Sequence, residues 1–87
     1  MKISKEKREK ISEQILSYLF HTHPQSKFTV DIARELARDE EFTKSLMMEL
    51  KKKGLVNDIR KNSEGIDYSR RIRWRLSNNA YSAYKAL

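Results

Sequence analysis

The chain has 87 residues, of which 38% are hydrophobic and 36% charged, a composition that suits one small domain with a modest core. It contains no cysteine, which excludes disulfides, thiolate metal sites and redox motifs, and its two glycines lie too far apart for a glycine-rich phosphate loop. The charged N-terminus lacks an apolar segment and the longest apolar run, "ILSYLF", is too short to span a membrane, so we expect a cytoplasmic protein without membrane contact.

The net charge of +7 is distributed unevenly along the chain. Residues 1–50 contain nine basic and nine acidic residues, whereas residues 51–75 contain nine basic and three acidic ones. A surplus confined to one third of the chain predicts a local cationic patch, which is typical of a protein with a polyanionic partner. The plainer interpretation is a solvated, solubilising surface.

Two helices are expected in the first part of the chain. The first covers residues 4–21, with Ser4 as its N-cap and apolar residues at helical spacing, and it ends before Pro24. A short extended segment, "KFTV", follows. The second helix covers residues 30–38, and we expect Thr29 to cap it.

A third helix is expected over residues 40–53. Asp39 can cap its start, and Gly54 is a natural stop after its last turn. Acidic residues open the helix and lysines close it, which suits the helix dipole at both ends. Its apolar residues, expected to face inward, are Phe42, Leu46, Met47 and Leu50.

After Gly54 the pattern changes to one typical of strands, and residues 55–76 are expected to form a β-hairpin around the turn-forming segment "KNSEG". In "RRIRWRLS", Ile72, Trp74 and Leu76 share one parity while arginines occupy the other. Successive side chains of a strand point to opposite faces, so the apolar set, including Trp74, is expected to be buried and the arginines exposed.

A short final helix is expected over residues 78–87, capped by Ser77. Its apolar residues include Tyr81, Tyr84 and Leu87. They can pack on the first helix, or they can form the seam of a homodimer. The sequence leaves monomer and homodimer open.

The order helix, short strand, helix, tight turn, helix, hairpin, helix resembles the winged helix-turn-helix domain of bacterial and archaeal transcription regulators. The resemblance rests on "FTVDIARELARDEEFTKSLMMELKKKGLV", residues 28–56, and on the hairpin end "RWRLS". The segment "RWRLSNNAYSAYKAL" is similar to the strand and final helix of multiple-antibiotic-resistance-type regulators. The resemblance implies an α+β, mainly α, fold in a single domain of residues 1–87, with a three-helix core, a C-terminal β-hairpin wing and a short final helix.

Such a domain is expected to bind double-stranded DNA as a small transcription regulator, with helix 40–53 in the major groove and the basic wing on the phosphate backbone. The helix residues expected to reach the DNA are Thr43, Lys44, Ser45 and Met48. The wing residues expected to contact phosphates are Arg60, Lys61, Arg70, Arg71, Arg73 and Arg75.

Two alternatives stay open at this point. Glu40 and Glu41 open the expected recognition helix and Glu49 adds a third acid, and carboxylates repel phosphate. These acids would suit a protein–protein interaction module that docks on a basic partner. RNA binding is a further alternative, because a basic wing alone does not distinguish the two kinds of duplex.

No cofactor, metal, small-molecule effector or catalytic group is expected. His21 and His23 have the wrong spacing for one face of a helix, and the sequence offers no further histidine or cysteine to complete a zinc site. Most of the acidic residues are spread along amphipathic helices as ordinary solvated charges. We therefore interpret the chain as a protein other than an enzyme.

Overall fold

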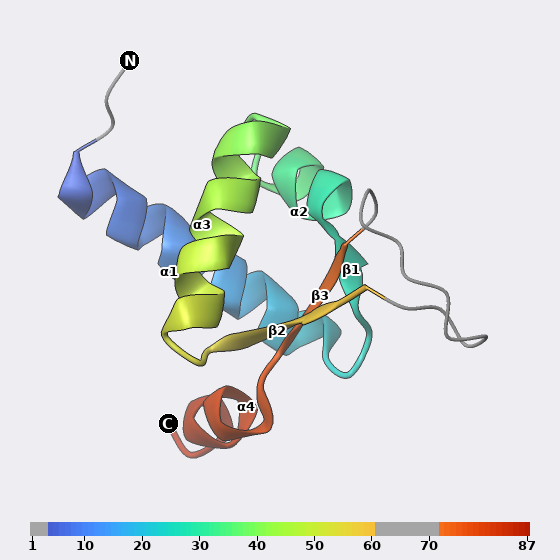
Figure 1. The fold of residues 1–87 in the computed structure, drawn as a ribbon. Coiled ribbons are helices and arrows are strands. Elements are labelled where there is room, and N and C mark those ends of the chain that lie inside the picture. Colours follow the sequence, from blue (N-terminus) through green and yellow to red (C-terminus); the bar gives the residue numbers. More distant parts are fainter. Residues whose placement is uncertain (1–3, 61–71) are drawn as a thin grey trace.

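The computed structural model describes residues 4–60 and 72–87. Its elements, in chain order, are α1 (Lys5–Thr22), β1 (Lys27–Phe28), α2 (Thr29–Glu35), α3 (Glu40–Lys52), β2 (Val56–Ile59), β3 (Arg73–Leu76) and α4 (Asn78–Lys85). Figure 1 shows α3 crossing α1, with α2 beside the upper half of α3. The three strands lie next to the helices, and α4 lies at the opposite end of the molecule from α2. The predicted order of elements is confirmed.

Local sequence signals account for the ends of α1 and α3. The Ser4 hydroxyl accepts a hydrogen bond from the Lys7 backbone N–H at the start of α1. The Asp39 carboxylate accepts one from the Phe42 N–H at the start of α3, 3.1 Å away. Gly54, just past the end of α3, has φ +76°, a conformation that glycine adopts without strain. These predicted caps and the glycine stop are confirmed.

The second helix is shorter than predicted. It ends at Glu35, with Leu36 as its C-cap, whereas the sequence predicts a helix over residues 30–38. Ala37 has φ +53°, in the left-handed region that terminates helices. The chain therefore turns toward α3 earlier than the apolar spacing indicates, and it does so without a glycine.

Thr29 does not cap α2, which corrects the prediction. The N-cap residue is Phe28, and its side chain makes no capping bond. The side chain of Thr29 is buried and its hydroxyl accepts a hydrogen bond of 2.8 Å from the indole Nε1 of Trp74. A buried indole N–H needs an acceptor, and satisfying it outweighs capping a solvent-accessible helix end.

The strands form an antiparallel sheet in the order β1-β3-β2, so the strand that carries Trp74 is central. Ile72, Trp74 and Leu76 are buried, while Arg73 and Arg75 are half-exposed on the other face. The predicted parity of this strand is confirmed. Its apolar face closes the core formed by α1, α2 and α3.

The last helix begins at a Ser77 cap and packs on the C-terminal end of α1. The Tyr81 ring stacks on His23 at 3.8 Å between centroids and lies 5.3 Å from Phe20. Tyr84 stacks on Phe20 at 5.6 Å. The two tyrosines therefore contact α1 and the residues that follow it, whereas Leu87 is 99% exposed.

Candidate nucleic-acid interface

One face of α3 is open to solvent. Six of the eight exposed side chains of α3 recur at helical spacing and form what we call the α3 stripe: Glu41, Lys44, Ser45, Met48, Lys51 and Lys52. The other two exposed residues are Glu40 and Glu49. The opposite face of α3 is buried in the core. Met48 is 40% exposed, which confirms its predicted exposure. The stripe is thus a polar ridge with three lysines, one glutamate and one flexible apolar side chain, and the exposed Glu40 and Glu49 lie beside it.

Thr43 is not part of this stripe, and its prediction as an outward residue was wrong. It is 1% exposed, and its hydroxyl donates a 2.8 Å hydrogen bond to the Asp39 carbonyl oxygen. Residue 43 precedes Leu46 and Met47 by three and four positions, so it lies on the same face of the helix as they do. The helical period could have identified Thr43 as a core residue.

Arg8 of α1 covers one side of the α3 stripe. Its Nη2 atom lies 2.9 Å from a Glu49 carboxylate oxygen and donates a 3.2 Å hydrogen bond to the Ser45 hydroxyl. Its guanidinium carbon lies 5.5 Å from the centre of the Phe42 ring. Of the three acids that raised doubt about α3, Glu49 is therefore paired, whereas Glu40 and Glu41 are exposed at the start of the helix. Sequence reasoning missed Arg8 because it lies 37 positions from Ser45 and has no local pattern that links them.

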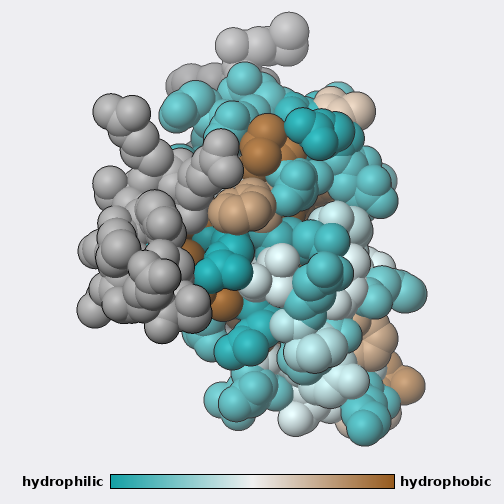
Figure 2. Space-filling view, turned by 90° about the vertical axis from the view of Figure 1, so that its right-hand side faces the viewer, coloured by the Kyte–Doolittle hydropathy of each residue, from teal (hydrophilic) through white to brown (hydrophobic). Residues whose placement is uncertain are grey.

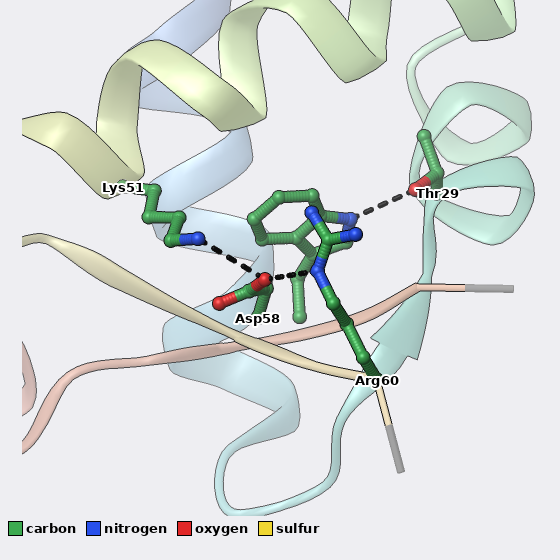
Figure 3. Close-up of polar contacts among 5 residues, drawn as sticks. Thr29, Lys51, Asp58 and Arg60 are labelled. Atoms are coloured by element: carbon green, nitrogen blue, oxygen red, sulfur yellow. Dashed lines mark hydrogen bonds and ion pairs between the residues drawn. The ribbon is translucent and has the colours of Figure 1, made fainter. Parts of the chain in front are cut away.

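A second ion-pair cluster joins the other side of the stripe to the base of the hairpin (Figure 3). One Asp58 carboxylate oxygen lies 2.6 Å from Arg60 Nε and 3.2 Å from Lys51 Nζ. The hydrogen bond from Arg60 holds the pKa of Asp58 below its usual value, against the opposing effect of burial, and Lys51 lowers it further. The cluster connects the last turn of α3 to β2.

The hairpin arginines that the structure describes do not all lie on the same side of the sheet. Asp58 pairs across the ladder with the buried Trp74, so Asp58 and its partner Arg60 lie toward α3. Arg73 and Arg75 lie on the opposite face, where the Arg73 guanidinium is 6.0 Å from the Phe28 ring. The alternation in the sequence separated the arginines from the core, but it could not show that Arg60 lies on the opposite face of the sheet from Arg73 and Arg75. Lys61, Arg70 and Arg71 lie outside the described residues.

Figure 2 shows the face of the molecule that lies at the right-hand side of Figure 1. Hydrophilic residues cover most of what is described there, and hydrophobic residues appear in small separate groups. Over these residues the face lacks the broad apolar patch that marks many protein–protein interfaces.

Neither histidine belongs to a metal site in the described part of the chain, where no three His, Asp or Glu side chains cluster suitably. His21 Nδ1 lies 2.7 Å from the Ser17 carbonyl oxygen, and His23 stacks on Tyr81. Within residues 4–60 and 72–87, no helix is both long enough and apolar enough to cross a membrane.

No protein-family model matches the chain, and no curated protein matches it. Several solved structures are similar in fold. MepR of Staphylococcus aureus, a transcription regulator of the multidrug efflux pump MepA, superposes with a TM-score of 0.69 at 22% identity over 87% of this chain and 52% of MepR. A complex of MepR with DNA gives a TM-score of 0.68 at 21% identity over 98% of this chain and 55% of that chain.

ZitR of Lactococcus lactis, as a mutant in its apo form, gives a TM-score of 0.71 at 21% identity over 93% of this chain and 56% of ZitR. The chain therefore spans about half the length of the solved structures it matches. At these identities the likeness is one of fold. The protein has the winged helix-turn-helix fold, with α2 and α3 as the helix-turn-helix and the hairpin of β2 and β3 as the wing.

Proposed function

We propose that this chain binds double-stranded DNA as the DNA-binding domain of a transcription regulator, with α3 in the major groove. The observation that carries the proposal is the α3 stripe, an exposed polar ridge with three lysines on the helix that occupies the recognition position of the fold. Similar chains support it, since MepR is a transcription regulator and has been solved with DNA.

The stripe offers contacts of several kinds. Lys44 and Lys52 can bind phosphates, or a guanine edge in the case of Lys44. Ser45 can donate a hydrogen bond, and Met48 can contact a thymine methyl group. Arg60, on the same side of the sheet as α3, is suited to a flanking phosphate. Arg73 and Arg75 would contribute less than Arg60, because they lie on the outer face of the sheet.

We propose a binding protein rather than an enzyme, and a cytoplasmic one, because MepR, which it resembles in fold, is a transcription regulator that has been solved with DNA. Assembly as a homodimer is a separate proposal. A two-fold dimer would place two copies of α3 about 34 Å apart, on successive major grooves. Leu87, at 99% exposure, is available for such a seam, while Tyr81 and Tyr84 are already engaged with α1. Sedimentation equilibrium of the parent and Leu87→Ser would test it, and a monomeric parent would overturn it.

The test of DNA binding is a fluorescence-anisotropy titration of a random-sequence duplex at several salt concentrations. We expect a Kd of about 1–100 µM near physiological salt that weakens steeply as salt rises. Lys44→Ala should weaken binding and lower the salt slope by about 0.9. Lys10→Ala is the matched control, because Lys10 is exposed on α1. A groove between α1 and α3 is lined by residues that include Arg8, Leu16, Glu49 and Leu50, and Lys10 is not among its lining residues.

Absence of binding at low salt would overturn the proposal and favour a protein partner for the acidic start of α3. Competition with an RNA duplex of matched sequence tests the remaining alternative, which is RNA binding. If the RNA duplex displaced the DNA at equal or lower concentration, RNA binding would replace the proposal.

A further inference from the structure

We propose that Arg8 of α1 is a positioning residue for sequence recognition: it orients the Ser45 hydroxyl so that α3 presents a hydrogen-bond donor to the DNA. The inference rests on the proposed function, because it concerns how the same helix reads base edges. It assigns a role in specificity to a helix that lies outside the helix-turn-helix itself.

The contacts of Arg8 all fall on one side of α3. The three residues that it touches, Phe42, Ser45 and Glu49, are spaced by three and four positions and so lie along one edge of the helix. One nitrogen, Nη2, reaches both the Ser45 hydroxyl at 3.2 Å and the Glu49 carboxylate at 2.9 Å. The Arg8 side chain is 29% exposed, so the guanidinium is partly shielded from water. A planar group held at three points has little freedom to turn.

This arrangement fixes what Ser45 can offer. A hydroxyl has one hydrogen to donate and lone pairs to accept with. Because Arg8 occupies the acceptor side, the Ser45 hydrogen is left to donate elsewhere. A donor on the exposed stripe matches the N7 and O6 acceptors of guanine in the major groove.

Glu49 is the third residue of this arrangement. Its carboxylate anchors the guanidinium, and the pairing draws a negative charge toward α1, away from the centre of the stripe. Without Arg8, Ser45 could rotate freely and Glu49 would stand unpaired beside the DNA. Affinity and sequence preference would then both change, and the two effects have to be separated by experiment.

The variant Arg8→Lys makes that separation, because it keeps the charge and loses the planar, multi-point contact. The parent is first used to select a preferred duplex from a randomised pool. Kd is then measured for the selected duplex and for a random one, and their ratio gives the specificity. The proteins compared are the parent, Arg8→Lys, Ser45→Ala, the double variant of these two, and Lys10→Arg as the control substitution on α1. Thermal unfolding confirms that each is folded at the assay temperature.

We expect Arg8→Lys to bind the random duplex within about twofold of the parent, since the charge is unchanged. Its specificity ratio should fall at least about threefold, as should that of Ser45→Ala, and the double variant should lose no more than Ser45→Ala alone. Lys10→Arg should match the parent.

An unchanged ratio in Arg8→Lys would overturn the inference, and so would independent, multiplying losses from the two single variants. A parent that binds all duplexes equally would also overturn it, because α3 would then read no sequence. A parent that binds neither duplex is a different result, since it removes the proposed function itself.

Discussion

The hydrogen bond between Trp74 and Thr29 joins the central strand to the start of α2. Replacing Thr29 with Val should show how much this bond contributes to the free energy of unfolding. Valine has nearly the same shape as threonine, so the substitution removes the acceptor without opening a large cavity. The indole N–H of Trp74 would remain buried without a partner. Trp74 is 0% exposed and Thr29 only 7%, so water has little access to replace the lost bond.

The expected cost follows from that burial. Leaving a buried polar group unsatisfied costs about 1–3 kcal/mol, and the full enclosure of the 2.8 Å bond places Thr29→Val near the middle of this range, at about 2 kcal/mol. For a domain of this size, a loss of about 2 kcal/mol lowers Tm by roughly 8–16 °C. Urea and thermal unfolding can be followed by the circular dichroism of the helices, which also serves variants that lack Trp74, the single tryptophan of the chain.

Thr43→Val is the matched control. Thr43 is equally buried and loses its hydroxyl, but its acceptor, the Asp39 carbonyl oxygen, also receives the Thr43 backbone N–H at 2.9 Å. No group is orphaned, so we expect a cost below about 1 kcal/mol. Combining Thr29→Val with Trp74→Phe completes the test, since the indole N–H is then absent. Coupling below about 0.5 kcal/mol in this cycle would refute the reasoning.

Three further predictions concern local features of the fold. Gly54→Ala should lower the free energy of unfolding by about 1–2 kcal/mol in urea, because residue 54 has φ +76°, a conformation that strains alanine. The added Cβ itself would meet no atom within 4 Å, so an unchanged stability would show that the backbone relaxes freely. Asp39→Ala should cost about 1 kcal/mol through loss of the cap on α3, and Asp39→Asn should retain most of it; equal losses would argue against the cap. The pKa of Asp58 is lower in the folded than in the unfolded chain, so its ionised form stabilises the fold above its usual pKa and this contribution is lost as pH falls through the folded value. The unfolding free energy of Asp58→Asn should therefore depend less steeply on pH below about pH 4 than that of the parent, and identical slopes would contradict the assignment.

What the sequence predicted correctly is what neighbouring residues determine. The caps of α1 and α3 and the alternation around Trp74 depend on residues a few positions apart, so spacing and side-chain chemistry sufficed. The stop at Gly54 followed from the same local chemistry.

What the sequence missed depends on contacts between distant segments. Thr29 has the chemistry of a cap, but its hydroxyl is taken by an indole 45 positions away. Arg8 and Ser45 lie on different helices, and nothing in either local pattern indicates that they meet. Thr43 is different, because helical spacing alone places it on the buried face of α3. It was predicted to be exposed because its side chain is polar. The sequence therefore predicted the exposure of Lys44, Ser45 and Met48 on α3, while the contacts of Arg8 and Thr43 depend on the packing.

The central claim is that α3 enters the DNA, and the most direct test is a titration of ¹⁵N-labelled protein with duplex DNA followed by two-dimensional NMR. We expect the largest amide shift changes to fall on Lys44, Ser45 and Met48, with smaller ones at Arg60 and little change in α4. Changes concentrated on α4 or around Arg75, with α3 unaffected, would contradict this claim.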